Sequence, residues 1–126
     1  MITANTYQLT DVVDRTNKFT TFPREIEAQT DHERETLLAV LTPDNPWGER
    51  QNAARKLGHM RDQDALPGLL AALPTDPFWM VRCTIIQALE VIGDPGAIPT
   101  LQEVAIHDGF QVVREYATEA IERLTR

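Results

Sequence analysis

The chain has 126 residues, of which 42% are apolar and 25% charged, an ordinary globular composition that argues against a disordered chain. This length fits one compact domain. With 12 basic and 19 acidic residues the net charge is −7. Nucleic acids and anionic membranes are bound through clustered Lys and Arg, so we expect neither nucleic acid nor membrane as a partner.

The first residues show no basic segment followed by an apolar run, so we expect no secretory signal. No apolar run reaches the ~20 residues that a membrane-spanning helix needs. The single cysteine, Cys83, cannot form an internal disulfide or supply a Cys-based zinc framework. Together these features predict a cytoplasmic protein.

Residues 1–30 differ in pattern from the rest of the chain. Leu9, Val12, Val13 and Thr16 recur at helical spacing and predict a short helix, and residues 22–29 predict a further short turn of helix. We expect 1–30 to be a capping segment for the first apolar face of the fold that follows. An arm that binds a partner is the alternative.

From residue 31 to the end, the sequence repeats every 32 residues without an insertion. The shift brings an Asp, an Arg and many apolar residues into register in all three copies. The recurring charged residues are Asp44, Asp76 and Asp108, and Arg50, Arg82 and Arg114. The period predicts a repeat domain over 31–126 with units at about 31–60, 64–92 and 96–126.

Each unit has the pattern of two helices. The first helices are predicted at 31–42, 65–74 and 97–107, and the second at 45–60, 77–92 and 109–125. Val81, Ile85, Leu89 and Ile92 give the second helix of the middle unit an apolar stripe. One hairpin cannot bury such a stripe alone, so the units must stack. We predict an all-α fold, an α-solenoid of three helical hairpins with an atypical N-terminal segment.

The helix ends carry chemical signals of their own. We predict that the three recurring aspartates are N-caps of the second helices, because an Asp side chain can accept from exposed backbone N–H groups. Pro77 is then expected at the first helical position. Gly93 is expected to end the second helix of the middle unit, where the turn Gly93–Gly96 begins.

The residues also carry a family resemblance. The run DPFWMVRCTIIQALEVIGDPGAIPTLQEV (76–104), followed by DGFQVVREYATEAIERL (108–124), closely resembles HEAT repeats of the short type named after phycobilisome lyases. Val81-Arg82 and Val113-Arg114 match the V-R pair of that pattern, whereas the first unit has Glu49-Arg50. The resemblance covers about 31–126 and implies the fold. It says little about function, because this repeat serves many unrelated roles.

The resemblance implies a structural role for the recurring charges. In such stacks the Asp and Arg of each unit form a ladder that ties neighbouring units together, and a planar guanidinium suits this because it can bridge two acceptors. A row of ligand-binding arginines is the alternative for Arg50, Arg82 and Arg114.

No constellation of residues predicts catalysis. His32, His59 and His107 fall in different units without the two-His spacing of a metal site, and phosphate-loop and nucleophile motifs are absent from the sequence. Cys83 stands where the other units have Gln51 and Glu115, which predicts a partly exposed, ordinary thiol on the inner surface. We expect a non-enzymatic protein without catalytic residues, cofactor or metal.

The concave surface of the second helices is the predicted binding face. The strip changes from a basic residue beside a tryptophan to an acidic cluster at the C-terminal end, which suits a basic segment of a protein partner. The predicted partner-binding residues are Trp47, Gln51, Arg55, Trp79, Gln87, Glu90, Glu115, Glu119 and Glu122. The alternative for the two tryptophans is that they seal the joints between units.

These features predict a non-enzymatic protein–protein interaction module, an adaptor that binds a protein partner on its concave surface. The family resemblance implies an alternative, a phycobilisome-related accessory factor that attaches, removes or handles a bilin. A homo-oligomer, in which the last unit docks on another copy, is a further alternative.

Overall fold

The computed structural model describes the backbone of residues 18–126 and the side-chain surroundings of residues 28–126. The chain divides into two parts, residues 1–33 and residues 34–126. The long first helix, α1 (Lys18–Val40), contributes to both parts. All regular elements in the described range are helices.

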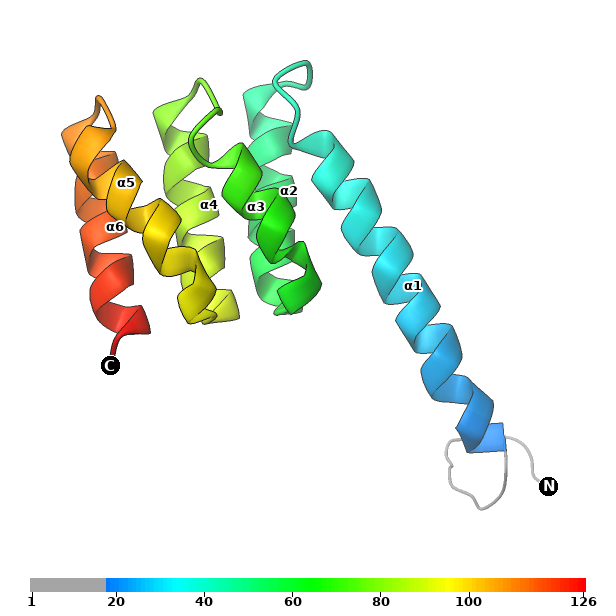
Figure 1. Cartoon of the computed structure of the whole chain (residues 1–126). Helices are drawn as coiled ribbons and strands as arrows, with labels where there is room; N and C mark the ends of the chain where they lie inside the picture. Colours follow the sequence, from blue (N-terminus) through cyan, green and yellow to red (C-terminus); the bar gives the residue numbers. More distant parts are fainter. Residues whose placement is uncertain (1–17) are drawn as a thin grey trace. The chain divides into compact units, whose positions relative to one another are not determined.

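Residues 34–126 form three stacked hairpins (Figure 1). The second helices α2, α4 and α6 lie side by side in one layer, and α3 and α5 lie in the other. The elements after α1 are α2 (Trp47–Met60), the 3-10 helix η1 (Gln63–Ala65), α3 (Leu66–Ala72), α4 (Trp79–Ile92), the 3-10 helix η2 (Pro95–Ala97), α5 (Ile98–His107) and α6 (Gln111–Leu124). The predicted all-α solenoid is therefore confirmed.

The first helix is longer than predicted. Its start was expected at residue 31, but α1 begins at Lys18. The stretch 24–36 consists largely of strong helix formers such as Glu, Arg, Ala and Gln, which favours an earlier helix start. The 32-residue repeat begins only near residue 31, so it could not predict this extension. The predicted helix near Leu9 lies outside the described residues. The capping role of 1–30 stays a prediction.

The predicted caps of the second helices were wrong. The N-cap positions of α2, α4 and α6 are Pro46, Phe78 and Phe110, and no side chain caps these helices. Asp76 lies two residues earlier and accepts the backbone N–H of Phe78 at 3.0 Å, and Asp108 does the same for Phe110. Pro77 accordingly precedes the cap and is not the first helical residue. Each aspartate closes a turn before its helix, which leaves carboxylate oxygens for a neighbouring unit.

The turn between the second and third units agrees with its sequence signal. Gly93 has φ +79° and ends α4, a conformation that glycine adopts at little cost. Asp94 then caps η2 by accepting the N–H of Gly96 at 2.8 Å. Asp62 caps η1 in the same way through the N–H of Asp64 at 2.9 Å.

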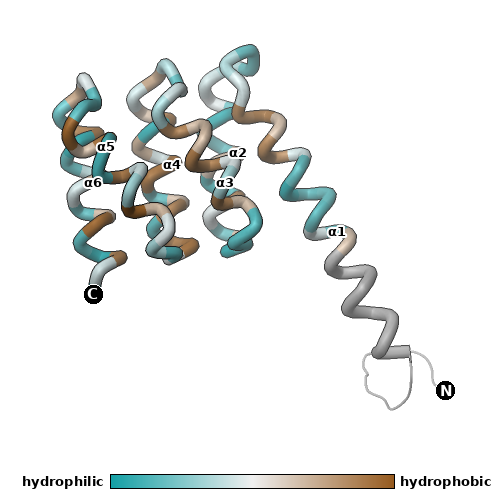
Figure 2. The backbone as a smooth tube through the Cα atoms, in the orientation of Figure 1, coloured by the Kyte–Doolittle hydropathy of each residue, from teal (hydrophilic) through white to brown (hydrophobic). Residues whose placement is uncertain are grey.

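The core lies between the two helical layers and between successive units. Its fully buried side chains include Leu57, Leu69, Ile85, Leu89 and Leu101. Burial of each such side chain stabilises the fold by about 1.5–3 kcal/mol. Hydrophobic and hydrophilic residues alternate along the helices of residues 34–126 (Figure 2), as expected for helices with one buried face.

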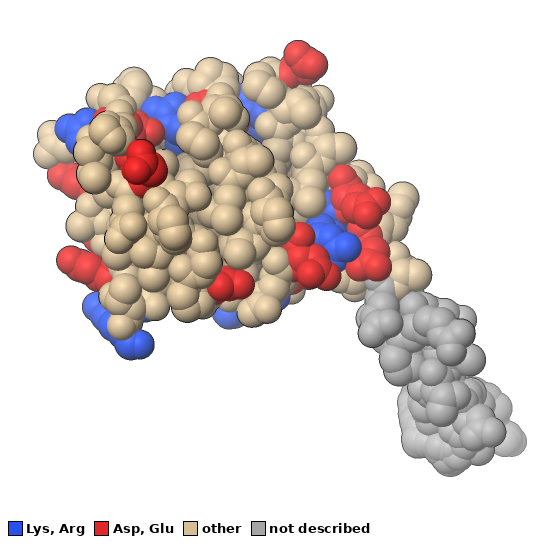
Figure 3. Space-filling view, viewed as in Figure 1, with Lys and Arg blue, Asp and Glu red and all other residues tan. Residues whose placement is uncertain are grey.

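The outer face over α3 and α5 carries few charged side chains, which gather at its margins (Figure 3). None of the described helices combines the length and the apolar composition that a membrane crossing requires.

Candidate functional site

The first joint between units is built on Arg50. Its Nε donates to one carboxylate oxygen of Asp76 at 2.8 Å, and its Nη2 to the other at 3.1 Å. Nη1 donates to the backbone carbonyl of Asn45. The side chains of Arg50 and Asp76 are 5% and 0% exposed. This buried, bidentate ion pair links α2 of the first unit to the turn before α4 of the second unit.

The second joint repeats this geometry with Arg82 and Asp108. Nε and Nη2 of Arg82 donate to the two carboxylate oxygens of Asp108 at 2.8 and 3.0 Å, and Nη1 donates to the carbonyl of Asp76 at 2.8 Å. Arg82 and Arg50 are both buried. Their guanidinium groups therefore bind acceptors within the fold and are not accessible to a ligand.

The two remaining residues of the expected ladder are placed differently. Arg114 donates to the carbonyl of Asp108 at 2.6 Å, and no carboxylate among the described residues pairs with it. Asp44 is exposed and has no ion pair within that range. The turn before α2 differs from the other two, because Asn45, rather than Asp44, supplies the carbonyl for the arginine of its unit.

Aromatic rings line the same edge of the stack. Trp47 packs edge-on against Phe78 of the next unit with ring centroids 4.9 Å apart, and Trp79 stacks on Phe110 of the unit after that at 6.2 Å. Phe78 and Trp79 also meet edge-on at 6.1 Å. Each tryptophan thus contacts the phenylalanine that precedes the next inner helix. Trp47 and Phe110, at the two ends of this row, remain about half exposed, at 48% and 49%.

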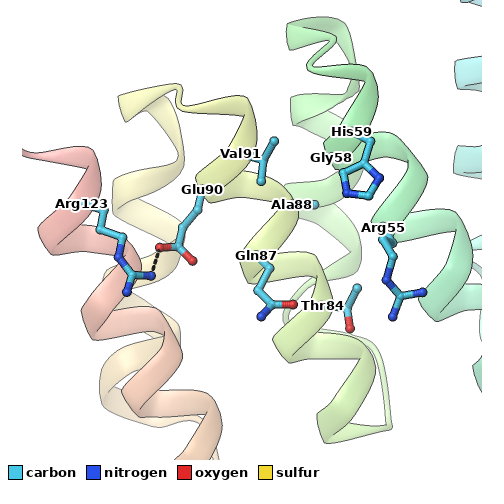
Figure 4. A pocket seen from close by; sticks show the side chains of 9 residues that line it. All are labelled: Arg55, Gly58, His59, Thr84, Gln87, Ala88, Glu90, Val91 and Arg123. Atoms are coloured by element: carbon cyan, nitrogen blue, oxygen red, sulfur yellow. Dashed lines mark hydrogen bonds and ion pairs between the residues drawn. The ribbon is translucent and has the colours of Figure 1, made fainter.

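A separate, open cavity of 460 Å³ lies on the face formed by α2, α4 and α6 (Figure 4). We call it the groove. Its lining, which is both polar and apolar, comes from two turns of α2, one face of α4 and a single residue of α6. The lining residues are Arg55, Gly58, His59, Thr84, Gln87, Ala88, Glu90, Val91 and Arg123.

One ion pair crosses the groove from α6 to α4. Nη1 of Arg123 donates to a carboxylate oxygen of Glu90 at 2.6 Å, and Figure 4 shows the two side chains reaching toward each other. The hydrogen bond to Glu90 and its negative charge raise the pKa of Arg123 above its usual value. Glu90 is only 15% exposed, so its carboxylate is committed to this pair.

The groove contains three of the nine residues predicted to bind a partner, namely Arg55, Gln87 and Glu90. Gln51 instead donates to the hydroxyl of Thr84 at 3.0 Å and so joins two units. The remaining predicted residues do not line the cavity: they are the two tryptophans at the aromatic edge and exposed carboxylates on α6, of which Glu119 lies 3.9 Å from Arg123. They are Trp47, Trp79, Glu115, Glu119 and Glu122.

Sequence reasoning missed several residues of these two surfaces. His59 and Arg123 line the groove, and Phe78 and Phe110 complete the aromatic edge. His59 and Arg123 could have been predicted from the sequence. They lie four residues after Arg55 and Glu119, two residues predicted to bind a partner, and so on the same faces of their helices. The phenylalanines come into register at the 32-residue shift, and each is the second residue of a predicted helix.

The prediction of a partly exposed Cys83 was wrong, because this residue is buried, with 7% exposure. Burial, with a smaller contribution from the charge of Asp108, raises the pKa of its thiol from 9.0 to about 11, although Arg82 acts in the opposite direction. The described residues contain no group of three or more His, Cys, Asp or Glu side chains that could hold a metal ion.

Residues 34–122 match the family model of HEAT repeats. The chain belongs to the HEAT-repeat family. The match covers all three hairpins and agrees with the stacking of α2, α4 and α6. Comparisons with curated proteins and with solved structures give no match. HEAT repeats commonly mediate protein–protein interaction.

Proposed function

We propose that this HEAT-repeat chain is a non-enzymatic adaptor that binds a segment of another protein in the groove formed by α2, α4 and α6. The observation that carries the proposal is the open cavity of 460 Å³ that all three inner helices line. A segment lying across it meets polar side chains from each repeat in turn, which is how stacked repeats build an extended binding surface.

The lining favours a protein segment over a small molecule. Small-molecule pockets enclose most of their ligand, whereas this cavity is open to solvent. Here the side chains of Arg55, His59 and Gln87 are exposed, and Ala88 and Val91 supply the apolar contribution. A peptide can satisfy several such groups with its backbone and side chains while it buries the aliphatic parts.

The exposed carboxylates of α6 extend this surface at one end. Glu115, Glu119 and Glu122 are all exposed, and Glu119 occupies the repeat position of Arg55 and Gln87. A basic residue of the partner, placed beyond the Glu90–Arg123 pair, would meet these carboxylates. Because the side chains are solvated, their main contribution is to the association rate and the orientation of the partner.

A photo-crosslinking experiment tests the groove directly. A benzophenone amino acid at Gln87, inside the groove, is compared with the same group at Gln102, which is exposed on the outer helix α5. In native lysate we expect protein adducts from position 87 that position 102 does not give, and that excess unlabelled wild-type protein suppresses. Identical adducts from both positions, or none from position 87, would contradict the proposal.

The phycobilisome-related alternative is supported by the sequence resemblance alone. The only cysteine of the chain is buried, so the fold exposes no thiol that could carry a bilin. Incubation of the protein with a bilin and phycobiliprotein subunits tests this role. A spectral shift or a covalent adduct on a subunit would favour it, and their absence would remove it.

A further inference from the structure

At the α2 end of the groove, the positively charged side chain of Arg55 has no carboxylate partner among the described residues. The guanidinium of Arg55 donates to the neutral side-chain oxygen of Asn52 at 2.9 Å, and no described acidic side chain pairs with it. The side chain is exposed and lines the cavity. His59 lies one helical turn further along the same face of α2 and lines it as well.

The carboxylate that lines the groove is already paired. Glu90 is the one carboxylate in the described lining, and Arg123 binds it at 2.6 Å from the far side of the groove. Its charge is therefore compensated by a cation from α6. What the α2 end offers a ligand is a guanidinium, an imidazole and the amide of Gln87, which are hydrogen-bond donors.

This local excess of donors runs against the composition of the chain, whose net charge is −7. At the repeat position of Arg55, the second unit has Gln87 and the third has Glu119. At this position the inner surface thus changes from positive through neutral to negative along the stack, and the one cation of α6 in the lining, Arg123, lies between Glu90 at 2.6 Å and Glu119 at 3.9 Å. A partner segment with an acidic residue would be attracted at α2 and repelled at α6, and this fixes the direction in which it lies.

We propose that the α2 end of the groove binds a side-chain carboxylate of the partner, with Arg55 as its principal ligand and Gln87 and His59 beside it. A guanidinium matches a carboxylate geometrically, because two parallel N–H groups can donate to its two oxygens. The occupant is a segment of another protein that places an acidic residue over α2 and leaves the α6 end to its basic residues. This inference rests on the proposed function and adds the chemistry and the orientation of the partner.

Panning a phage library of random peptides tests both ideas separately. The library is selected on wild-type protein and then depleted on a Gln87→Trp variant, in which the indole fills the groove. Peptides that survive only on wild type, and that share an Asp or Glu, support the inference. Survivors without an acidic residue overturn it while leaving the proposed function in place. If no peptide binds in a way that depends on the groove, both the inference and the proposed function are overturned.

The selected peptides then identify the residue that binds the carboxylate. Fluorescence anisotropy is measured with Arg55→Gln, and with Lys56→Gln as the matched control, because Lys56 is exposed on the same helix but does not line the groove. We expect Arg55→Gln to weaken binding about tenfold or more, the usual range for a charge-assisted hydrogen bond, and Lys56→Gln to have little effect. Equal losses would show that general charge, and not Arg55, binds the peptide.

A matched peptide completes the test. When the shared Asp or Glu is replaced by Asn or Gln, wild-type binding should fall by the same factor, while binding to Arg55→Gln should change little. Independent losses in the peptide and in the protein would place the carboxylate elsewhere and contradict the assignment. Far-ultraviolet circular dichroism of each variant checks that the fold is intact.

Discussion

The helices α4 and α6 occupy the same position in successive repeats but differ in how much they bury. In α4 nine residues are buried, among them Ile86, and in α6 only three. At the repeat position of Ile86, α6 has the exposed Thr118. A unit on each side covers α4, whereas α6 has a neighbour on one side within the described residues. The place of a helix in the stack therefore decides which of its faces is core.

The charged residues make the same contrast. Arg82 and Arg114 both hold a backbone carbonyl of their own unit through Nη1, so both guanidinium groups are oriented alike. Arg82 also has the carboxylate of Asp108 from the next unit, and Arg114 has no such partner among the described residues. The bidentate arginine–aspartate pair thus forms in this stack only where a further unit follows the arginine.

The largest effect is expected from breaking a joint. Arg50→Ala leaves the carboxylate of Asp76, which is 0% exposed, buried without a counter-ion, at a cost of about 3–5 kcal/mol in the free energy of unfolding. Arg114→Ala is the control, because it removes one hydrogen bond to a carbonyl, worth about 1 kcal/mol. Urea denaturation followed by circular dichroism measures both. Equal midpoints would show that the joints contribute no more than the end of the stack.

The next largest effect is expected from apolar packing, which also differs between α4 and α6. Ile86→Ala removes a fully buried side chain between two units, and we expect a loss of about 2–5 kcal/mol. Thr118→Ala, at the same position of the exposed repeat, should change the free energy of unfolding by less than about 0.5 kcal/mol. The same denaturation experiment applies. A large effect at Thr118 would mean that this face of α6 is covered in solution.

The 32-residue period was sufficient to predict the fold, because every unit must bury the same stripe against the same kind of neighbour. It also located Arg55, Gln87 and Glu90 on the inner surface. It did not show that Arg123 of α6 reaches Glu90 of α4 across the groove. The groove is therefore a property of three helices together.

The wrong predictions have the same origin. Asp76 was expected to cap its own helix, but its carboxylate is shared between a local turn and an arginine of the preceding unit. Cys83 was expected to be partly exposed, because Gln51 and Glu115 are polar at the equivalent positions. Those two residues belong to the first and last units, whereas the middle unit is covered from both sides. Comparison of repeats predicts conformation well and burial poorly.

A close approach between two inner helices gives a smaller effect. A Cβ added to Gly58 would come within 2.8 Å of Cα of Ala88, so the helices must move apart, and Gly58→Ala should destabilise by about 1–3 kcal/mol. Gly48 lies on the same helix α2 with open space around it. Gly48→Ala should therefore stabilise, by up to about 1 kcal/mol. Thermal melts of the two variants should shift in opposite directions, and shifts of the same sign would refute this account of the joint.

The smallest effect on stability, absent at neutral pH, is expected from Cys83. Its folded-state pKa of about 11 lies above the ordinary thiol pKa of 9.0, so the unfolded chain loses the thiol proton first as the pH rises. The thiol therefore costs the fold nothing below about pH 9, and the fold loses stability only as the pH rises from 9 toward 11.

Thiol alkylation provides a direct measurement, because the thiolate is the reactive form. Raising the thiol pKa from 9.0 to about 11 lowers the thiolate fraction at pH 8 about a hundredfold, so iodoacetamide should label native Cys83 at least that much more slowly than the urea-unfolded chain. The control is a Cys83→Ala chain carrying Glu115→Cys, which moves the thiol to the equivalent, exposed position of α6. That thiol should react at nearly the unfolded rate. Similar slow labelling at both positions would mean that α6 is as covered as α4, and the contrast between the two helices would fail.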